Sequence, residues 1–200
     1  MSKKKPRKKK ETYLSLSRYV LPNDPGTMLI RTDGACLANG QQSPKAGWAI
    51  WHGERFSGEN RIASGRLETK GPSGDECMQT SNRAELRAVV AALGLRHWPG
   101  EGFDTLVIAT DSEYVVEGAT KWTKSWIEYS WVKGSGDPVK NRDLWELLLE
   151  EVEKFKQYGM DIKFWRIPRE WNTVTDAAAK EAAAQGEASD VWINIIGLPF

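Results

Sequence analysis

The sequence is poor in cysteine and lacks any long hydrophobic run. Among its 200 residues the only cysteines are Cys36 and Cys77, too few for a disulfide framework or a zinc site of four thiolates. No apolar stretch approaches the roughly 20 residues of a membrane-spanning helix, and the basic N-terminus is not followed by the apolar segment of a signal peptide. These absences exclude a disulfide scaffold and a membrane-spanning protein, and they favour a reducing intracellular compartment.

Positive charge is concentrated at one end of the chain. The net charge is only +1, yet residues 1–10 hold seven Lys and Arg and no acid, so the remainder is acidic overall. We expect residues 1–26 to form a disordered basic arm and linker that contacts nucleic acid, acts as a nuclear-import signal, or only improves solubility. The lysine run predicts a nuclear location, and the cytoplasm is the alternative.

Hydrophobic periodicity predicts alternating strands and helices. We expect strands at 27–32, 47–52, 55–67, 105–110 and 160–167, and helices at 82–96, 113–121, 141–158 and 176–185. Three strands in succession form an antiparallel meander, whereas strands separated by helices pair in parallel. The prediction is an α/β fold with a five-stranded mixed sheet, helices on both faces, and an apolar tail at 187–200 packed on the body.

Acidic residues stand at the ends of predicted elements. Asp33 and Asp111 directly follow strands, and neighbouring strand ends converge on the ligand crevice of an α/β sheet. Two close carboxylates repel unless a cation neutralises them, and an all-oxygen site selects Mg²⁺ or Mn²⁺. Glu85 and Asp176 lie in the first turns of helices. Each acid alone is commonly a turn former or a helix cap, so only the set of four indicates metal chemistry.

Four sequence blocks resemble the signature blocks of type 1 ribonuclease H and follow the same order. They are residues 32–36 (TDGAC), 80–86 (TSNRAEL), 110–116 (TDSEYVV) and 139–145 (VKNRDLW), followed by Asn172 and Asp176. The resemblance covers about residues 27–186 and implies a ribonuclease H-like fold with a catalytic domain over that range.

The resemblance implies hydrolysis of the RNA strand in RNA–DNA hybrids, with 5′-phosphate and 3′-hydroxyl products. It also implies that Asp33, Glu85, Asp111 and Asp176 are the catalytic residues and hold two Mg²⁺ ions, with Mn²⁺ as an alternative. Residues 167–175 contain no His where many relatives carry one. The rival hypotheses are therefore a nucleic-acid-binding module with weak or no catalysis, and a metal nuclease for another duplex. We expect a monomer without an obligate protein partner.

The same resemblance implies a set of substrate contacts. For the RNA strand they are Cys36, Asn39, Asn82 and Glu113, for a DNA-strand phosphate Thr80 and Asn141, and for the DNA channel Trp122 and Trp126, with Asn172 as a further contact. Glu113 stands where many relatives carry Gln. Considered alone, tryptophans at helical spacing are more often core residues, and a free cysteine such as Cys36 is often a buried thiol.

Overall fold

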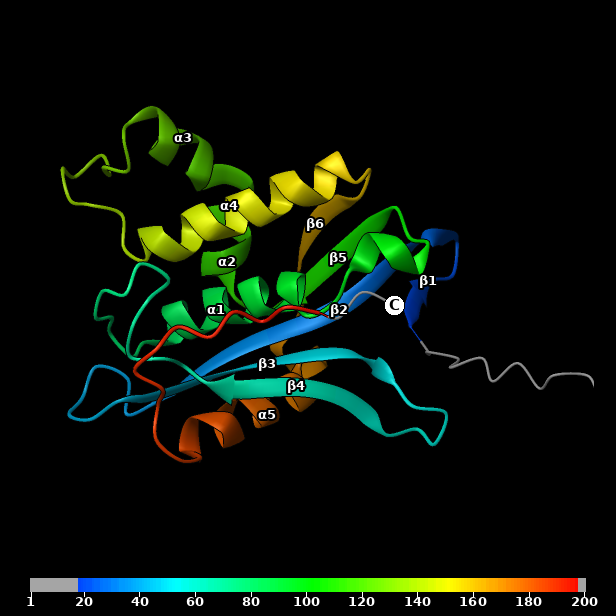
Figure 1. Cartoon of the computed structure of the whole chain (residues 1–200), viewed down its shortest axis with the longest axis horizontal. Helices are drawn as coiled ribbons and strands as arrows, with labels where there is room; N and C mark the ends of the chain where they lie inside the picture. Colours follow the sequence, from blue (N-terminus) through cyan, green and yellow to red (C-terminus); the bar gives the residue numbers. More distant parts are fainter. Residues whose placement is uncertain (1–17, 198–200) are drawn as a thin grey trace, which may run out of the picture.

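A mixed β-sheet forms the centre of the molecule (Figure 1). The computed structural model describes residues 18–197. Its strands are β1 (Tyr19–Leu21), β2 (Asp24–Leu37), β3 (Lys45–Glu54), β4 (Asn60–Arg66), β5 (Thr105–Thr110) and β6 (Asp161–Arg166). The order is β4-β3-β2-β5-β6, antiparallel from β4 to β2 and parallel from β2 to β6. This confirms the predicted α/β fold and its five-stranded mixed sheet.

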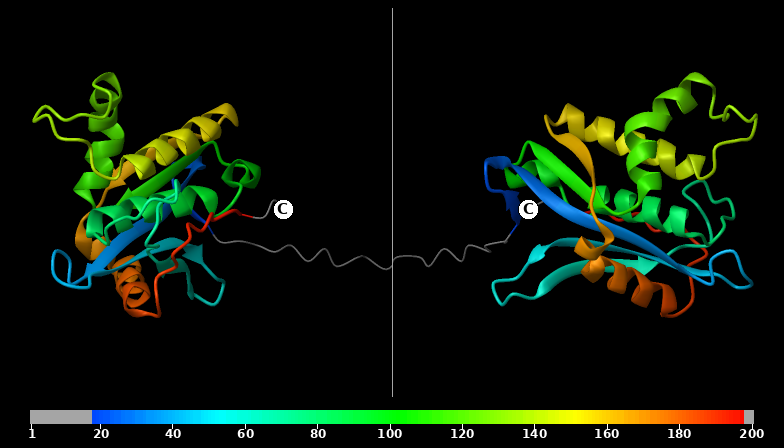
Figure 2. Two further views of the ribbon diagram at one scale, coloured as in Figure 1. Left: turned by 60° about the vertical axis from the view of Figure 1, so that its left-hand side comes forward. Right: turned by 180° about the vertical axis from the view of Figure 1, so that it is seen from behind.

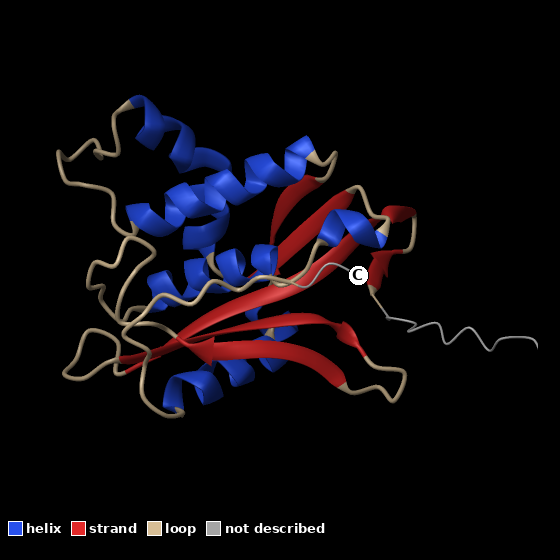
Figure 3. Ribbon diagram, viewed as in Figure 1, coloured by secondary structure: helices blue, strands red, loops and turns tan. Residues whose placement is uncertain are grey.

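Helices cover both faces of the sheet, as predicted (Figure 3). They are α1 (Ser81–Gly94), α2 (Glu113–Glu117), α3 (Thr123–Glu128), α4 (Arg142–Gln157) and α5 (Thr173–Ala184), with short turns of helix at Trp98–Glu101, Gly118–Trp122 and Arg169–Trp171. Helices α1 and α4 lie on one face, and α5 lies on the other (Figure 2). The main core fills the space between the sheet and helices α1 and α4.

Small residues set the spacing of these layers. The alanines of α1 are fully buried at helical spacing, so this helix packs closely on the sheet. On the opposite face, a Cβ atom at Gly47 would overlap the backbone of α5 at Ala183. Glycine at this position of β3 therefore allows α5 to approach the sheet directly.

The structure places an additional strand before the predicted first one. Strand β1 pairs antiparallel with β2, and β2 itself begins at Asp24. The predicted arm and linker, residues 1–26, therefore includes ordered structure from Arg18 onward. A strand of three residues, followed at once by Pro22, carries too little periodicity to be recognised in the sequence. Residues 1–17, with the basic run and the nuclear address inferred from it, lie outside the described part.

The predicted helix at 113–121 is interrupted. It forms α2 and continues into a π-helical turn at Gly118–Trp122. Helix α3 follows directly, beyond the predicted range. A Cβ atom at Gly118 would overlap the ring of Trp145 on α4, so the turn forms where α4 packs against this segment. The predicted last helix also begins earlier than expected, at Thr173.

The segment after α5 runs back across the molecule along α1 (Figure 1). The backbone N–H of Thr69 donates to Ser189, and that of Gly197 donates to Gly94 at the end of α1. Arg87 of α1 donates to the carbonyl oxygen of Ile193 at 2.8 Å. Residues 187–197 thus lie against the body, while 198–200 lie outside the described residues.

Among residues 18–197 no helix is both long and apolar enough to cross a membrane.

Candidate active site

Two of the four acids are brought together by strand pairing. In the parallel pair of β2 and β5, Arg31 is in register with Ala109. Two residues further along each segment come Asp33 and Asp111, so the two acids lie side by side. Asp111 follows β5 as predicted, but the prediction that Asp33 follows its strand is wrong, because pairing with β3 extends β2 to Leu37. Asp33 is almost completely buried, at 4% exposure. The position of these two acids follows directly from the sheet order.

Glu85 reaches the same place from α1. Thr80 caps this helix, and its hydroxyl oxygen accepts the N–H of Arg83 at 3.3 Å. A Cβ atom at Gly34 would overlap the backbone of Glu85, so glycine after Asp33 lets the first turn of α1 touch β2. One carboxylate oxygen of Glu85, Oε2, is shielded from solvent and has no hydrogen-bond partner among the described residues.

Asp176 approaches from the first turn of α5 and is held by cations. Its carboxylate oxygens contact the guanidinium of Arg169 at 3.3 Å and the ammonium of Lys180 at 2.7 Å. The fully buried Asn172 just before α5 donates its amide N–H groups to Asp111 Oδ1 at 2.8 Å and to the carbonyl oxygen of Thr32 at 3.0 Å. Asn172 therefore ties the start of α5 to the middle of β2 and to the end of β5.

The electrostatics show that the acids influence one another. Burial, together with the negative charges of Asp111 and Asp176, raises the pKa of Asp33 from 3.8 to about 7. Burial, with Asp33 and Asp111 nearby, raises the pKa of Glu85 well above its ordinary value. Like charges gathered in a buried place favour protonation or a bound cation.

The donor set fits a hard divalent cation. All four side chains offer carboxylate oxygens, the ligands preferred by Mg²⁺ and Mn²⁺, and Glu85 Oε2 is a buried oxygen without a partner. Among residues 18–197, however, no group of three or more His, Cys, Asp or Glu side chains is drawn close enough to hold an ion. Asp176 is turned to Arg169 and Lys180 instead, as repulsion between uncompensated carboxylates predicts.

Comparison with known proteins assigns the chain to a family. The family model described as RNase H matches residues 25–184. The chain belongs to the ribonuclease H family, type 1. It is 34% identical to a ribonuclease H of Actinobacillus pleuropneumoniae over 166 residues, covering 82% of this chain and 95% of the relative. It is 37% identical to one of Xanthomonas oryzae over 128 residues, covering 64% and 73%.

Solved ribonuclease H structures share the fold. The crystal structure of LC9-RNase H1, a type 1 RNase H with the type 2 active-site motif, superposes with a TM-score of 0.55 at 24% identity, over 84% of this chain and 77% of that one. A foamy viral protease-reverse transcriptase in complex with an RNA/DNA hybrid gives a TM-score of 0.57 at 18% identity, over 92% of this chain and 22% of that one.

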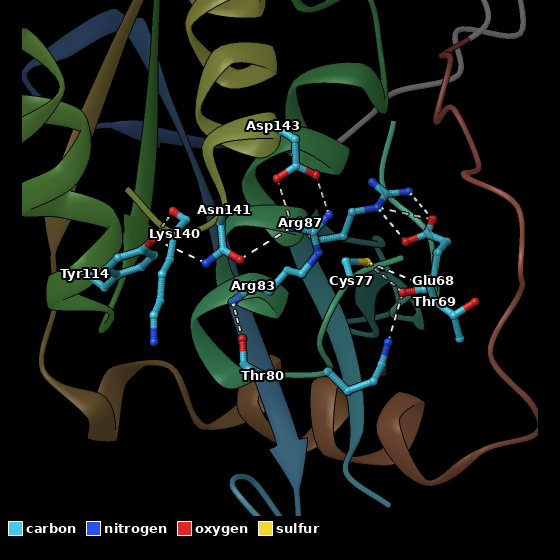
Figure 4. Close-up of polar contacts among 11 residues, drawn as sticks. Glu68, Thr69, Cys77, Thr80, Arg83, Arg87, Tyr114, Lys140, Asn141 and Asp143 are labelled. Carbon is cyan, nitrogen blue, oxygen red and sulfur yellow. Dashed lines mark hydrogen bonds and ion pairs between the residues drawn. The ribbon is translucent and has the colours of Figure 1, made fainter. Parts of the chain in front are cut away.

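In this ribonuclease H the two residues predicted to grip a phosphate lie in one polar network (Figure 4). The Asn141 side chain accepts from Arg83 at 3.4 Å and donates to the Tyr114 hydroxyl at 3.3 Å. The backbone N–H of Arg83 donates to the hydroxyl of the helix cap Thr80. The guanidinium of Arg83 forms a bidentate ion pair with Asp143 at 2.9 and 2.5 Å. Asn141 has a left-handed backbone, with φ of 56°, a strained conformation that tends to cluster at functional sites.

Sequence reasoning did not single out Arg83, Tyr114 or Asp143. All three lie inside the recognised blocks, at residues 80–86, 110–116 and 139–145, so their neighbourhood was the available signal. What the sequence could not show is that Arg83 is almost fully buried and receives its counter-charge from α4.

The residues predicted to contact the RNA strand lie near the end of β2, on the loop after it and at the starts of α1 and α2. Asn39 and Asn82 are exposed, and Cys36 is half-buried with its thiol directed to the carbonyl oxygen of Gln79 at 3.4 Å. Burial raises the pKa of the Cys36 thiol. Glu113 is exposed and pairs with Arg166 at 2.9 Å.

The tryptophans divide between core and surface. Trp126 packs against Trp145 and Trp131, with ring centroids 5.4 and 6.2 Å apart, and Trp131 is buried. Trp122 contacts Trp126 at 5.7 Å and remains 36% exposed. The core interpretation therefore holds for Trp131, whereas Trp122 offers an aromatic surface to a ligand.

Proposed function

We propose that this ribonuclease H is a divalent-metal-dependent endonuclease that hydrolyses the RNA strand of RNA–DNA hybrids, leaving 5′-phosphate and 3′-hydroxyl ends. The observation that carries the proposal is the convergence of Asp33, Glu85, Asp111 and Asp176 on one edge of the sheet. Their shared influence on the pKa of Asp33 and Glu85 supports it. The names of the ribonuclease H relatives support the same activity.

These four side chains would hold two Mg²⁺ ions, which supply activation of a water and stabilisation of the leaving 3′-oxygen when bound. Asp33 is influenced by Asp111 and Asp176 and itself influences Glu85. It is therefore the acid best placed to help hold both ions. Asp176 must exchange its contacts with Arg169 and Lys180 for this role. Arg169 is exposed and long, so it can release Asp176 and turn to a substrate phosphate.

The polar network on the other side of α1 would anchor the DNA strand. Thr80 and Asn141 present neutral groups beside the buried guanidinium of Arg83, and such contacts position a duplex without reading its sequence. Trp122 would pack against the deoxyribose groups of the DNA strand, further along the duplex. Cys36, Asn39, Asn82 and Glu113 would line the RNA strand, whose 2′-hydroxyls lie in the minor groove.

Asn172 serves in this proposal as a positioning residue, since its side chain is buried and reaches Asp111 instead of the surface. Replacing it by Ala should lower cleavage about 10- to 100-fold, as changes to residues that orient metal ligands do. Because Asp111 is loosened and not removed, excess Mg²⁺ should restore part of the activity. Rates measured across a Mg²⁺ titration check this, and an undiminished rate at low Mg²⁺ would contradict the positioning role.

A cleavage assay with several substrates tests the function itself. End-labelled RNA–DNA, RNA–RNA, DNA–DNA and single-stranded RNA are incubated with and without Mg²⁺ or Mn²⁺. Of these substrates we expect only the RNA–DNA hybrid to be cleaved, in its RNA strand, and only when a metal is present. Binding of the hybrid without cleavage would favour the rival hypothesis of a binding module, and cleavage of another duplex would favour a different metal nuclease.

A further inference from the structure

A group of exposed aromatic side chains lies on the α5 side of the sheet, next to the candidate active site. Trp165 of β6, Trp171 and Tyr19 of β1 are 43%, 54% and 49% exposed. With Arg31, Leu29, Ala109 and Ile167 they line a cavity of about 290 Å³. We call this group the aromatic platform.

The platform exists because α5 covers only part of its face. Helix α5 packs on β2, β3 and β4, and the view from behind in Figure 2 shows β6 beside α5. Trp165 and Trp171 contact each other edge to face, with ring centroids 6.2 Å apart, and Tyr19 contacts Trp51 in the same way at 6.3 Å. Large apolar groups exposed together in this way mark interaction surfaces.

The charge of the platform favours a negatively charged ligand. The guanidinium of Arg31 stacks on Trp51 at 4.7 Å and makes no ion pair with the residues that the structure describes. No Asp or Glu of residues 18–197 lines the cavity. Aromatic faces beside an unpaired cation are the combination with which proteins bind single-stranded nucleic acid, because the bases stack and the cation meets the phosphates.

The platform lies next to the candidate active site. A second cavity of about 410 Å³, lined by Asp111, Arg166, Ile167, Pro168 and Arg169, shares Ile167 with it. Along β2 and β5, Arg31 and Ala109 precede Asp33 and Asp111 by two residues, which is about 7 Å of strand. Trp171 directly precedes Asn172. A strand that leaves a hybrid at the acids can therefore reach the platform within a short distance.

We propose that the aromatic platform binds an unpaired nucleotide of a single-stranded extension on the hybrid substrate, with the base stacked on Trp165 and Trp171 and the phosphate paired with Arg31. This inference rests on the proposed function, since it places the hybrid at the four acids. The cavity of about 290 Å³ is close to the lower end, about 300 Å³, of small-ligand sites, a size that suits one base.

The test measures binding without cleavage. Fluorescence anisotropy of the metal-free full chain is recorded with a blunt RNA–DNA hybrid and with hybrids that carry a short overhang of RNA or of DNA at either end. We expect at least one overhang to tighten binding about tenfold, since a stacked base contributes about that much. Comparison of the RNA overhangs with the DNA overhangs identifies which strand supplies the stacked base.

Variants assign the effect to the platform. In Trp165→Ala the overhang advantage should disappear while affinity for the blunt hybrid stays as in the wild type, and Trp165→Phe should retain part of it. Phe56→Ala removes a more exposed aromatic, 77% exposed in the turn between β3 and β4, and should change neither value. The unchanged blunt-hybrid affinity also reports that Trp165→Ala is folded.

Two results would overturn the proposal: no overhang tightens binding, as expected if the platform instead contacts a protein, or the advantage persists in Trp165→Ala. Failure of the proposed function looks different. In that case the blunt hybrid is neither bound nor cleaved, whereas single strands still bind to the wild type and not to Trp165→Ala.

Discussion

Replacing Asp33 by Asn should abolish hybrid cleavage and at the same time stabilise the metal-free protein. Cleavage should fall on the order of 10³-fold, because the variant removes the carboxylate central to the proposed metal site. Unfolding of the metal-free protein at pH 8 should cost about 2 to 4 kcal/mol more than in the wild type, since a tenfold difference in proton affinity between the folded and unfolded chain corresponds to about 1.4 kcal/mol. Chemical denaturation with and without Mg²⁺ measures the free energy of unfolding of the metal-bound and the metal-free protein.

The gain in stability should depend on pH in a defined direction. The pKa of Asp33 is raised to about 7 in the folded chain from an ordinary 3.8, so between these values the folded state keeps a proton that the unfolded state loses. The wild type therefore loses stability as pH rises from about 4 to about 7. Asp33→Asn does not titrate, so its advantage should vanish near pH 4.

Two controls make this result specific. Glu153→Gln removes an exposed carboxylate on α4 and should change neither cleavage nor the pH slope. Mg²⁺ should stabilise the wild type and not Asp33→Asn, because a ligand stabilises the state that binds it. Full cleavage by Asp33→Asn would remove the basis for the metal assignment.

Breaking the buried ion pair between Arg87 and Glu68 should destabilise this protein strongly. The side chains are 1% and 2% exposed, with Nη2 and Oε1 separated by 2.7 Å. The guanidinium lies between the rings of Trp48 and Trp192, at 5.1 and 4.2 Å from their centroids. Arg87→Met should lower the free energy of unfolding by about 3 to 5 kcal/mol, because it leaves the Glu68 charge buried and unpaired.

The double variant Arg87→Met with Glu68→Leu separates charge from packing. It should recover much of the loss, since apolar groups of similar volume often replace a buried ion pair at little cost. The exposed pair of Arg142 and Glu146, 2.8 Å apart, supplies the matched control, and Glu146→Gln should cost less than about 1 kcal/mol. A double variant as unstable as Arg87→Met would show that lost packing, not the unpaired charge, causes the effect.

This ion pair also explains why the segment after α5 is held in place. Arg87 donates to the carbonyl oxygen of Ile193 and stacks on Trp192, while its own position on α1 is two residues beyond Glu85. The stability of the ion pair and the position of one proposed metal ligand thus depend on the same helix.

The sequence by itself determined the fold class and pointed to the four acids as candidate metal ligands. The pattern placed Asp33 and Asp111 directly after the apolar runs 27–32 and 105–110. Parallel pairing of these two strands brings both acids together, although β2 itself continues past Asp33 to Leu37. It also placed Glu85 and Asp176 near the starts of helices, which is a local property of capping and periodicity. These features depend on residues close to one another along the chain, so the pattern carries them.

Only the tertiary structure decided what surrounds those acids. Asn172 lies 61 residues from Asp111, and the pairing of Arg83 with Asp143 spans 60 residues, so no local spacing reveals either contact. The raised pKa of Asp33 arises from burial between three elements, and the aromatic platform exists because α5 ends its contact at β2. Burial and partial coverage are properties of packed layers, and the order of residues along a chain does not encode them locally.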